Sequence, residues 1–171
     1  MSKRDLKKYL IGLTKDQLED QIIDLYSQFK EVKTYYDFAF NPKEDKLMEE
    51  AKFKISKEYF PVTKRKAKLR RSVAQKLIKH FIVLGVDPLL LADLMLYTIE
   101  IAQTYTESKS MTQLSFYPSM LKSFEQAFDF IHNHGLKMQF IDRMENIVEE
   151  AEKQKWINYP SFDVVLDKGI H

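Results

Sequence analysis

Apolar residues recur every three to four positions through each long segment of this 171-residue chain, and this spacing places them on one face of an α-helix. One such stripe runs through Leu18, Ile22 and Leu25. Only four glycines are present, and no segment alternates apolar and polar residues over more than a few positions, as a half-buried strand does. The sequence therefore predicts an all-α fold.

Helix start and stop signals divide the chain into about seven helices. Ser2 with Asp5 and Thr14 with Gln17 have the spacing of a capping box, in which side chains satisfy free amides of the first turn. Further start signals are predicted at Asn41, Ser72 and Asp87, and stop signals at Gly12, Pro61, Gly85 and Gly135. The predicted helices cover about residues 2–12, 14–40, 41–60, 72–84, 87–107, 116–133 and 137–153.

We expect a single helical domain over residues 1–171. Its predicted parts are N-terminal helices (1–60), a basic connector (62–71), core helices (72–155) and a docking tail (156–171). Short links pair neighbouring helices as antiparallel hairpins, arranged as a helical-repeat-like stack or as a compact bundle. The helix over 87–107 is apolar on almost every side, which predicts a place at the centre of the fold.

The charges are segregated along the chain. No acidic residue lies between Glu58 and Asp87, where eight lysines and arginines lie, whereas residues 87–171 hold seven basic and thirteen acidic side chains. Such asymmetry is an argument about binding partners and not about fold. The candidate anion-binding residues are Lys64, Arg65, Lys66, Lys68, Arg70, Arg71 and Ser72.

Two interpretations of this basic segment stay open. The predicted helix N-terminus after Ser72 favours anions, and Arg70 and Arg71 directly ahead of it could clamp a phosphate. Alternatively, the segment is a connector whose cations pair with the acidic second half, at Asp93 or Glu100. A nucleic acid would use residues 64–79, with Tyr59 and Phe60 nearby for base stacking. The chain nevertheless carries no nucleic-acid-binding signature, and Tyr59 lies on an apolar stripe that favours core packing.

Other side chains are weaker candidates. Tyr35 and Phe38 lie off the apolar stripe of their helix, so they either pack within the fold or bind a partner protein. Asp93 and Glu100 have either a raised pKa in an apolar surrounding or a cationic partner from a neighbouring helix.

No metal site, cofactor site or catalytic constellation is predicted. Glu125, Asp129 and His132 share a helix face but have no matching ligand set on a second helix, which favours a solvated face. The chain has no cysteine, no glycine-rich nucleotide loop and no nucleophile elbow.

Several features favour a cytoplasmic protein that does not span a membrane. The N-terminal residues do not form the apolar core of a signal peptide. The longest apolar stretch, residues 89–102, is interrupted by Asp93 and Glu100. The absence of cysteine fits a reducing compartment.

Four segments resemble an uncharacterised family of small bacterial proteins, a domain of unknown function, and the similarity spans nearly the whole chain. The resemblance implies a small single-domain bacterial protein and carries no activity, substrate or catalytic residue. Residues 2–26 also resemble the helical-hairpin modules of some nucleic-acid-binding proteins. The four segments are 35–38 (YYDF), 41–46 (NPKEDK), 54–61 (KISKEYFP) and 70–76 (RRSVAQK).

Three hypotheses follow. The first is a non-catalytic module that binds another protein, and a homo-oligomer is compatible with it. The second is the binding of a nucleic acid or another phosphate-bearing polyanion through residues 64–79. The third is an enzyme acting through Asp93 and Glu100. We also expect the apolar tail, residues 156–171, to dock on the helices or on a second copy.

Overall fold

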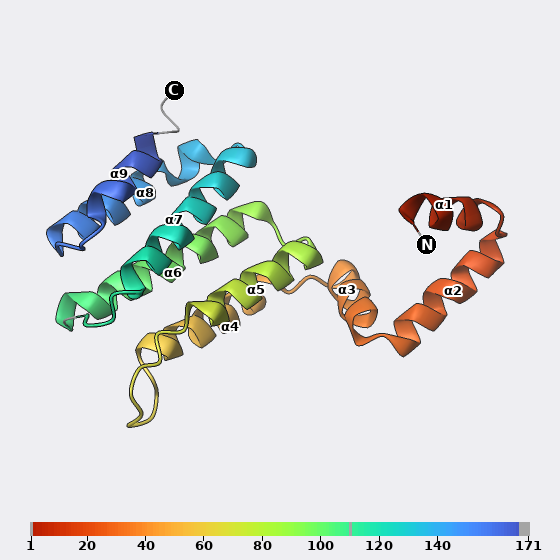
Figure 1. Ribbon diagram of the computed structural model, residues 1–171. Coiled ribbons are helices and arrows are strands. Elements are labelled where there is room, and N and C mark those ends of the chain that lie inside the picture. The colour runs from red at the N-terminus through yellow and green to blue at the C-terminus, as the bar shows by residue number, and fades with distance from the viewer. Residues whose placement is uncertain (1, 110, 168–171) are drawn as a thin grey trace. The chain divides into compact units, whose positions relative to one another are not determined.

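A computed structural model describes residues 2–109 and 111–167, and every regular element in them is an α-helix, which confirms the all-α prediction. The described helices, nine in number, are labelled in Figure 1. They are α1 (Lys3–Ile11), α2 (Lys15–Gln28), α3 (Lys30–Phe40), α4 (Glu44–Tyr59), α5 (Arg71–Leu84), α6 (Pro88–Ser108), α7 (Phe116–Asn133), α8 (Lys137–Lys153) and α9 (Tyr159–Asp167). The two beyond the predicted seven arise from a break at Phe29 and from the tail.

The predicted capping boxes begin α1 and α2. The amide of Asp5 donates to Ser2 Oγ at 3.3 Å, and the amide of Ser2 donates back to the Asp5 carboxylate at 2.9 Å. Thr14 and Gln17 make the same reciprocal pair at 3.3 and 3.0 Å. α5 ends as predicted at Gly85, whose φ of 76° lies in the left-handed region that glycine adopts without steric cost.

The long second helix of the prediction is instead two helices. Phe29 leaves the helical region with φ −116° and ψ 115°, and it is both the last cap of α2 and the first cap of α3. Its amide still donates to the carbonyl of Leu25 at 2.9 Å, and its carbonyl accepts from the amide of Lys33 at 3.0 Å. The break therefore keeps the backbone hydrogen bonds on both sides and needs no glycine or proline.

Two predicted helix starts are wrong. Asn41 ends α3, because its amide donates to carbonyls of that helix at Asp37 and Phe38, and α4 begins at Glu44. Ser72 lies inside the first turn of α5, which begins at Arg71 with Arg70 as a cap that makes no side-chain hydrogen bond. Asp87 is the predicted cap of α6 and accepts the amide of Leu89 at 2.7 Å.

The chain divides into two compact units, residues 1–43 and 44–171. The first holds α1 to α3, and none of the residues in these three helices is buried. α2 and α3 pack together, with the Tyr26 hydroxyl donating to Asp37 at 2.8 Å and the Tyr26 ring edge-on to Tyr36. The predicted single domain remains a prediction.

The second unit is a compact helical stack around α6. This helix packs against α4, α5, α7 and α8, and α5 to α9 run in alternating directions (Figure 1). Fully buried α6 side chains include Leu94, Leu96 and Ile99. The predicted central place of this helix is confirmed. α4, which the prediction grouped with the N-terminal helices, belongs to this unit.

The tail docks on the stack, as predicted. α9 packs against α7 and α8, and Phe162 and Val165 are buried there. Trp156, just before α9, is also buried, with its ring edge-on to Phe116 and Phe162. Residues 168–171 of the predicted tail lie outside the described residues.

Candidate anion-binding site

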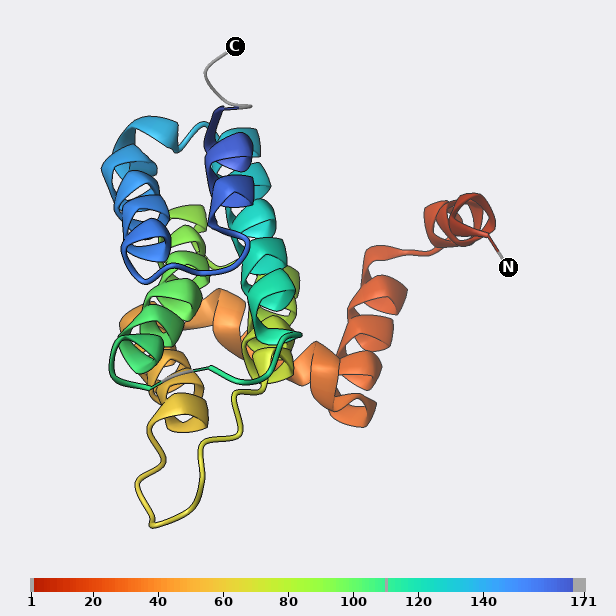
Figure 2. The same ribbon diagram turned by 60° about the vertical axis from the view of Figure 1, so that its left-hand side comes forward.

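The predicted connector is a protruding loop between α4 and α5, closed at its base by one residue of α4. We call residues 60–70 the basic loop, and Figure 2 shows it extending beyond the ends of the helices. The carbonyl of Glu58 accepts the amides of Lys68 and Leu69 at 2.9 and 3.0 Å. Leu69 turns the chain toward α5 with a φ of 53°, a backbone conformation that costs a residue other than glycine free energy. The base of the loop is therefore fixed.

Arg70 completes this closure. Its guanidinium donates two hydrogen bonds of 2.8 Å to the buried carboxylate of Glu58, a bidentate pair. The hydrogen bonds from Arg70 lower the pKa of Glu58 from its ordinary value, although burial acts in the opposite direction. Arg70 therefore holds the loop in place and is already neutralised by a carboxylate of its own chain.

Arg71 also faces inward. Its Nε donates to Ser123 Oγ at 2.6 Å and its Nη2 to Gln126 Oε1 at 2.7 Å, so it ties α5 to α7. Burial lowers the pKa of the Arg71 guanidinium. Both guanidinium groups of the predicted phosphate clamp are therefore already hydrogen-bonded within the protein, and anion binding by Arg70 and Arg71 stays a prediction. The exposed Ser72 hydroxyl lies on the first turn of α5.

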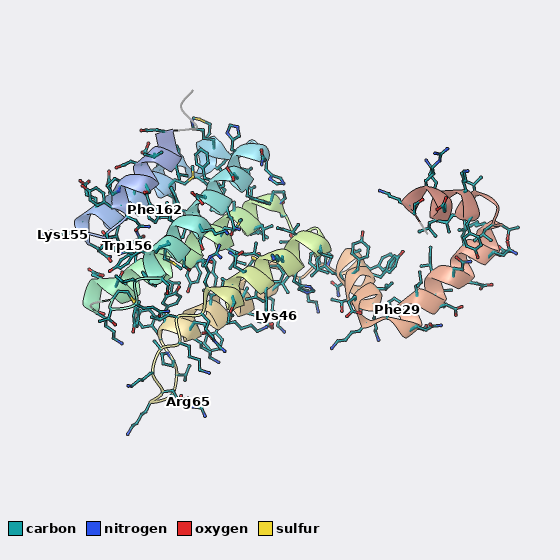
Figure 3. All side chains as sticks on the ribbon, viewed as in Figure 1. Phe29, Lys46, Arg65, Lys155, Trp156 and Phe162 are labelled. Atoms are coloured by element: carbon teal, nitrogen blue, oxygen red, sulfur yellow. The ribbon has the colours of Figure 1, made fainter. Side chains whose placement is uncertain are left out.

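The other four predicted cations lie in the loop itself. Lys64, Arg65, Lys66 and Lys68 are exposed, and none of them forms an ion pair with any residue that the structure describes. Figure 3 shows Arg65 at the tip of the loop, pointing away from the helices. These four side chains are therefore exposed and free of direct ion pairs, and Lys68 is near enough to Glu58 to help lower the pKa of that carboxylate.

The neighbouring helices contribute three more cations, of which Lys76 lies within the predicted segment 64–79 and Lys54 and Lys57 do not. A hollow of about 280 Å³ under the loop is lined by Lys57 together with Arg65, Lys66 and Lys68. A second hollow of about 420 Å³, between α4 and α5, is lined by Lys54, Lys57 and Lys76. Glu58 and Arg70 line both hollows, and Glu58 is the one carboxylate in either lining. We call the free cations of both linings, together with the exposed Lys64 of the loop, the cationic surface: Lys54, Lys57, Lys64, Arg65, Lys66, Lys68 and Lys76.

Sequence reasoning missed Lys54 and Lys57, because they lie outside the acid-free segment and Glu49, Glu50 and Glu58 balance them in any count of charge. The available signal was their spacing of three residues, which places both on one side of α4.

The carboxylates of α6 have partners elsewhere. Arg143 of α8 donates to both Asp93 and Glu100, and Lys52 of α4 pairs with Asp93. This confirms pairing with cations from neighbouring helices, and the alternative pairing of Asp93 or Glu100 with the basic connector is wrong. Burial alone would raise the pKa of Asp93, but the hydrogen bonds from Lys52 and Arg143 hold the pKa below its ordinary value. The raised pKa that the enzyme hypothesis required of Asp93 is therefore wrong.

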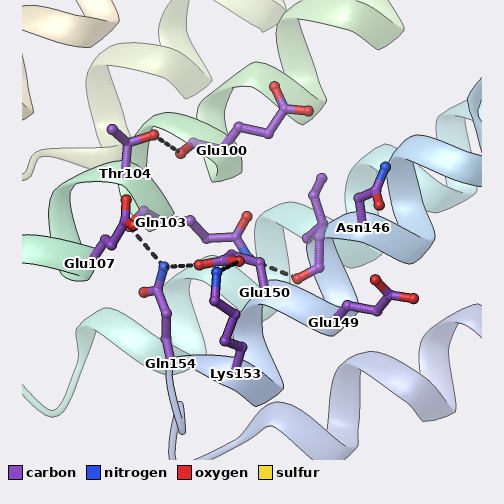
Figure 4. A pocket seen from close by; sticks show the side chains of 10 residues that line it. Glu100, Gln103, Thr104, Glu107, Asn146, Glu149, Glu150, Lys153 and Gln154 are labelled. Carbon is purple, nitrogen blue, oxygen red and sulfur yellow. Dashed lines mark hydrogen bonds and ion pairs between the residues drawn. The ribbon is translucent and has the colours of Figure 1, made fainter.

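A polar groove of about 520 Å³ runs between α6 and α8 (Figure 4). Its side chains are largely bonded to one another: Gln154 donates to Glu150 at 2.8 Å, and Lys153 donates to the same carboxylate at 3.0 Å. Gln103 donates to the carbonyl of Ile147 at 2.7 Å. The bonds to Glu150 are local to α8, whereas the bond from Gln103 and a second one, from Gln154 to the carbonyl of Gln103 at 3.1 Å, join α6 to α8.

The remaining candidates are placed as follows. In α3, Tyr35 is exposed and Phe38 is half-buried, and their role in partner binding stays a prediction. Glu125, Asp129 and His132 are exposed on α7. Among the described residues, no three histidine, aspartate or glutamate side chains come together as a metal site.

In the part of the chain that the structure describes, no helix is both long and apolar enough to cross a membrane.

Comparison with known proteins gives a family without an assigned activity. No curated protein and no solved structure matches the sequence. A family model matches residues 1–169, which confirms the resemblance noted from the sequence. The chain belongs to that family, which is described as a family of unknown function (DUF6155).

Proposed function

We propose that this protein is a non-catalytic interaction module that binds a polyanionic partner on the cationic surface. One observation carries the proposal: six of the seven cations of the cationic surface line two adjoining hollows, Lys64 lies exposed in the same loop, and none of the seven forms an ion pair with a described carboxylate. Seven cations without ion pairs attract a polymer of phosphates or sulfates, and neutralising charges of that polymer releases the counterions condensed on it.

The alternative hypotheses receive less support. Docking of another protein on Tyr35 and Phe38 remains a prediction, since these side chains carry no feature beyond partial exposure. Catalysis at Asp93 and Glu100 would need a raised pKa at Asp93. The two cations paired with Asp93 lower its pKa instead.

Retention on a heparin column tests the proposal with a generic polyanion. We expect K64Q/R65Q/K66Q/K68Q to elute at lower salt than the wild-type protein, because four solvent-facing charges are removed from the cationic surface. The matched control is K3Q/R4Q/K7Q/K8Q, which removes three lysines and one arginine from exposed positions of α1 and so gives the same net charge.

The control should elute with the wild-type protein. Equal loss of retention in both variants would mean that net charge alone drives binding. The absence of any retention of the wild-type protein at low salt would refute the proposal outright. Far-ultraviolet circular dichroism of each variant establishes that the helices are intact.

A further inference from the structure

Two aromatic rings lie on the outward face of α4 beside the cationic surface. Phe53 is 54% exposed and Phe60, directly after the helix, is 41% exposed. With Lys57 between them they follow the spacing i, i+4, i+7, which places all three on one face, about 10 Å from end to end along the axis. The Lys57 ammonium lies 4.1 Å from the centre of the Phe53 ring and also lines both cationic hollows.

The ring of Phe60 packs against an aromatic ring of α6. Tyr105 of α6 contacts it edge-on, with the ring centres 5.8 Å apart. The same Tyr105 ring packs against the buried Tyr59 at 5.9 Å. The contact with Tyr105 restrains the ring of Phe60. A ligand that packs against the exposed part of this ring therefore costs little conformational entropy of the Phe60 side chain.

Isolated exposed phenylalanines are ordinary on protein surfaces, so the informative feature is where these two lie. Cations alone are enough to bind a sulfated or phosphorylated polymer that offers only its charged groups. A single-stranded nucleic acid offers phosphates together with unpaired bases, and every base has a flat face that stacks on an aromatic ring. A duplex hides these faces between its base pairs, and an acidic peptide has no comparable succession of them.

We infer that the polyanion is a single-stranded nucleic acid, whose phosphates contact the cationic surface while bases stack on Phe53 and Phe60. This inference rests on the proposed function and narrows it to one ligand class. Stacking tolerates any base, so binding should depend little on sequence.

Fluorescence anisotropy tests the inference with a labelled 20-nucleotide oligothymidine, a 20-base-pair duplex and a poly-glutamate peptide at one salt concentration. We expect the wild-type protein to bind the single strand at least tenfold more tightly than the duplex or the peptide. F53L/F60L should bind the single strand about tenfold or more weakly, since the loss of one stacked base has an effect of this order. Its heparin elution should be unchanged.

Two control variants separate stacking from packing. F40L changes a ring of α3 that is 84% exposed and should bind all three probes as the wild-type protein does. F53W/F60W keeps both flat faces and should retain tight binding. The added tryptophan emission should be quenched by oligothymidine and unaffected by heparin.

Equal affinity for the single strand and the duplex, or for the single strand and the peptide, would overturn the inference. Wild-type affinity of F53L/F60L for the single strand would do so as well. In each of these cases heparin retention through the basic loop would leave the proposed function standing. Loss of heparin retention by the wild-type protein would refute both.

Discussion

Three residues of the stack bind two of the eight cations between Glu58 and Asp87. The Glu58 carboxylate neutralises Arg70, and the side chains of Ser123 and Gln126 hold Arg71 inward. The partner of Arg70 lies twelve residues back, and those of Arg71 lie more than fifty residues ahead. No local pattern distinguishes these two arginines from Lys64 or Arg65, so their roles could not be predicted from the sequence.

Arg143 is the residue whose removal should cost the most among the ion pairs. R143M leaves Asp93 with Lys52 alone and Glu100 without its two hydrogen bonds. Loss of one partner of a buried pair costs about 3–5 kcal/mol. Because these side chains are about one-third exposed, we expect about 2 kcal/mol in urea unfolding at pH 7.

The sign of the pH dependence follows from Asp93. Its pKa is lower in the folded protein than in the unfolded chain, so its stabilising effect is present above the ordinary pKa of 3.8 and is lost as the pH falls through the folded pKa. The deficit of R143M should therefore shrink at pH 3. An equal deficit at pH 7 and pH 3 would contradict the assigned ion pairs. K122M, at an exposed lysine of α7, should unfold like the wild-type protein at both values.

At the scale of the element, local capping chemistry predicts some boundaries and misses others. The boxes at Ser2 and Thr14 act within four residues and are found as expected. The break at Phe29 has no breaker residue, and contacts between α2 and α3 such as that from Tyr26 to Asp37 accompany it. Capping needs only neighbours along the chain, whereas the break at Phe29 involves side chains eleven residues apart.

The docking of α9 depends on aromatic packing that a single reporter can follow. Trp156 is the one tryptophan of the chain, and its ring contacts that of Phe162, which also packs against Phe124. F162A should destabilise the protein by about 3–5 kcal/mol because it leaves a cavity at a fully buried site. It should also shift the Trp156 emission to longer wavelength as water reaches the indole.

V164A is the matched control for α9. Val164 lies on the exposed face of the same helix, so its truncation should change the free energy of unfolding by less than about 0.5 kcal/mol and leave the emission unchanged. An unshifted Trp156 emission in F162A would show that α9 does not depend on this contact.

At the scale of the whole molecule, the fold class, the central place of α6 and the docking of the tail could be predicted from the sequence. Each depends on a property that is visible in the order of the residues, either the 3.6-residue period of apolar positions or the apolarity of one segment. The cationic surface could be predicted only in part. Lys54 and Lys57 of α4 belong to the cationic surface because α4 and α5 pack side by side. This packing is a property of the tertiary fold.

The salt dependence of polyanion binding tests the central claim most directly. For a labelled single-stranded oligonucleotide, log affinity falls linearly with log salt, and each phosphate contact adds about 0.7 to the magnitude of this negative slope. We predict that K64Q/R65Q/K66Q/K68Q reduces the magnitude of the slope by about 3, the value for four lost contacts, while K3Q/R4Q/K7Q/K8Q leaves it as in the wild-type protein. An unchanged slope in the loop variant, or an equal decrease in both variants, would contradict the account.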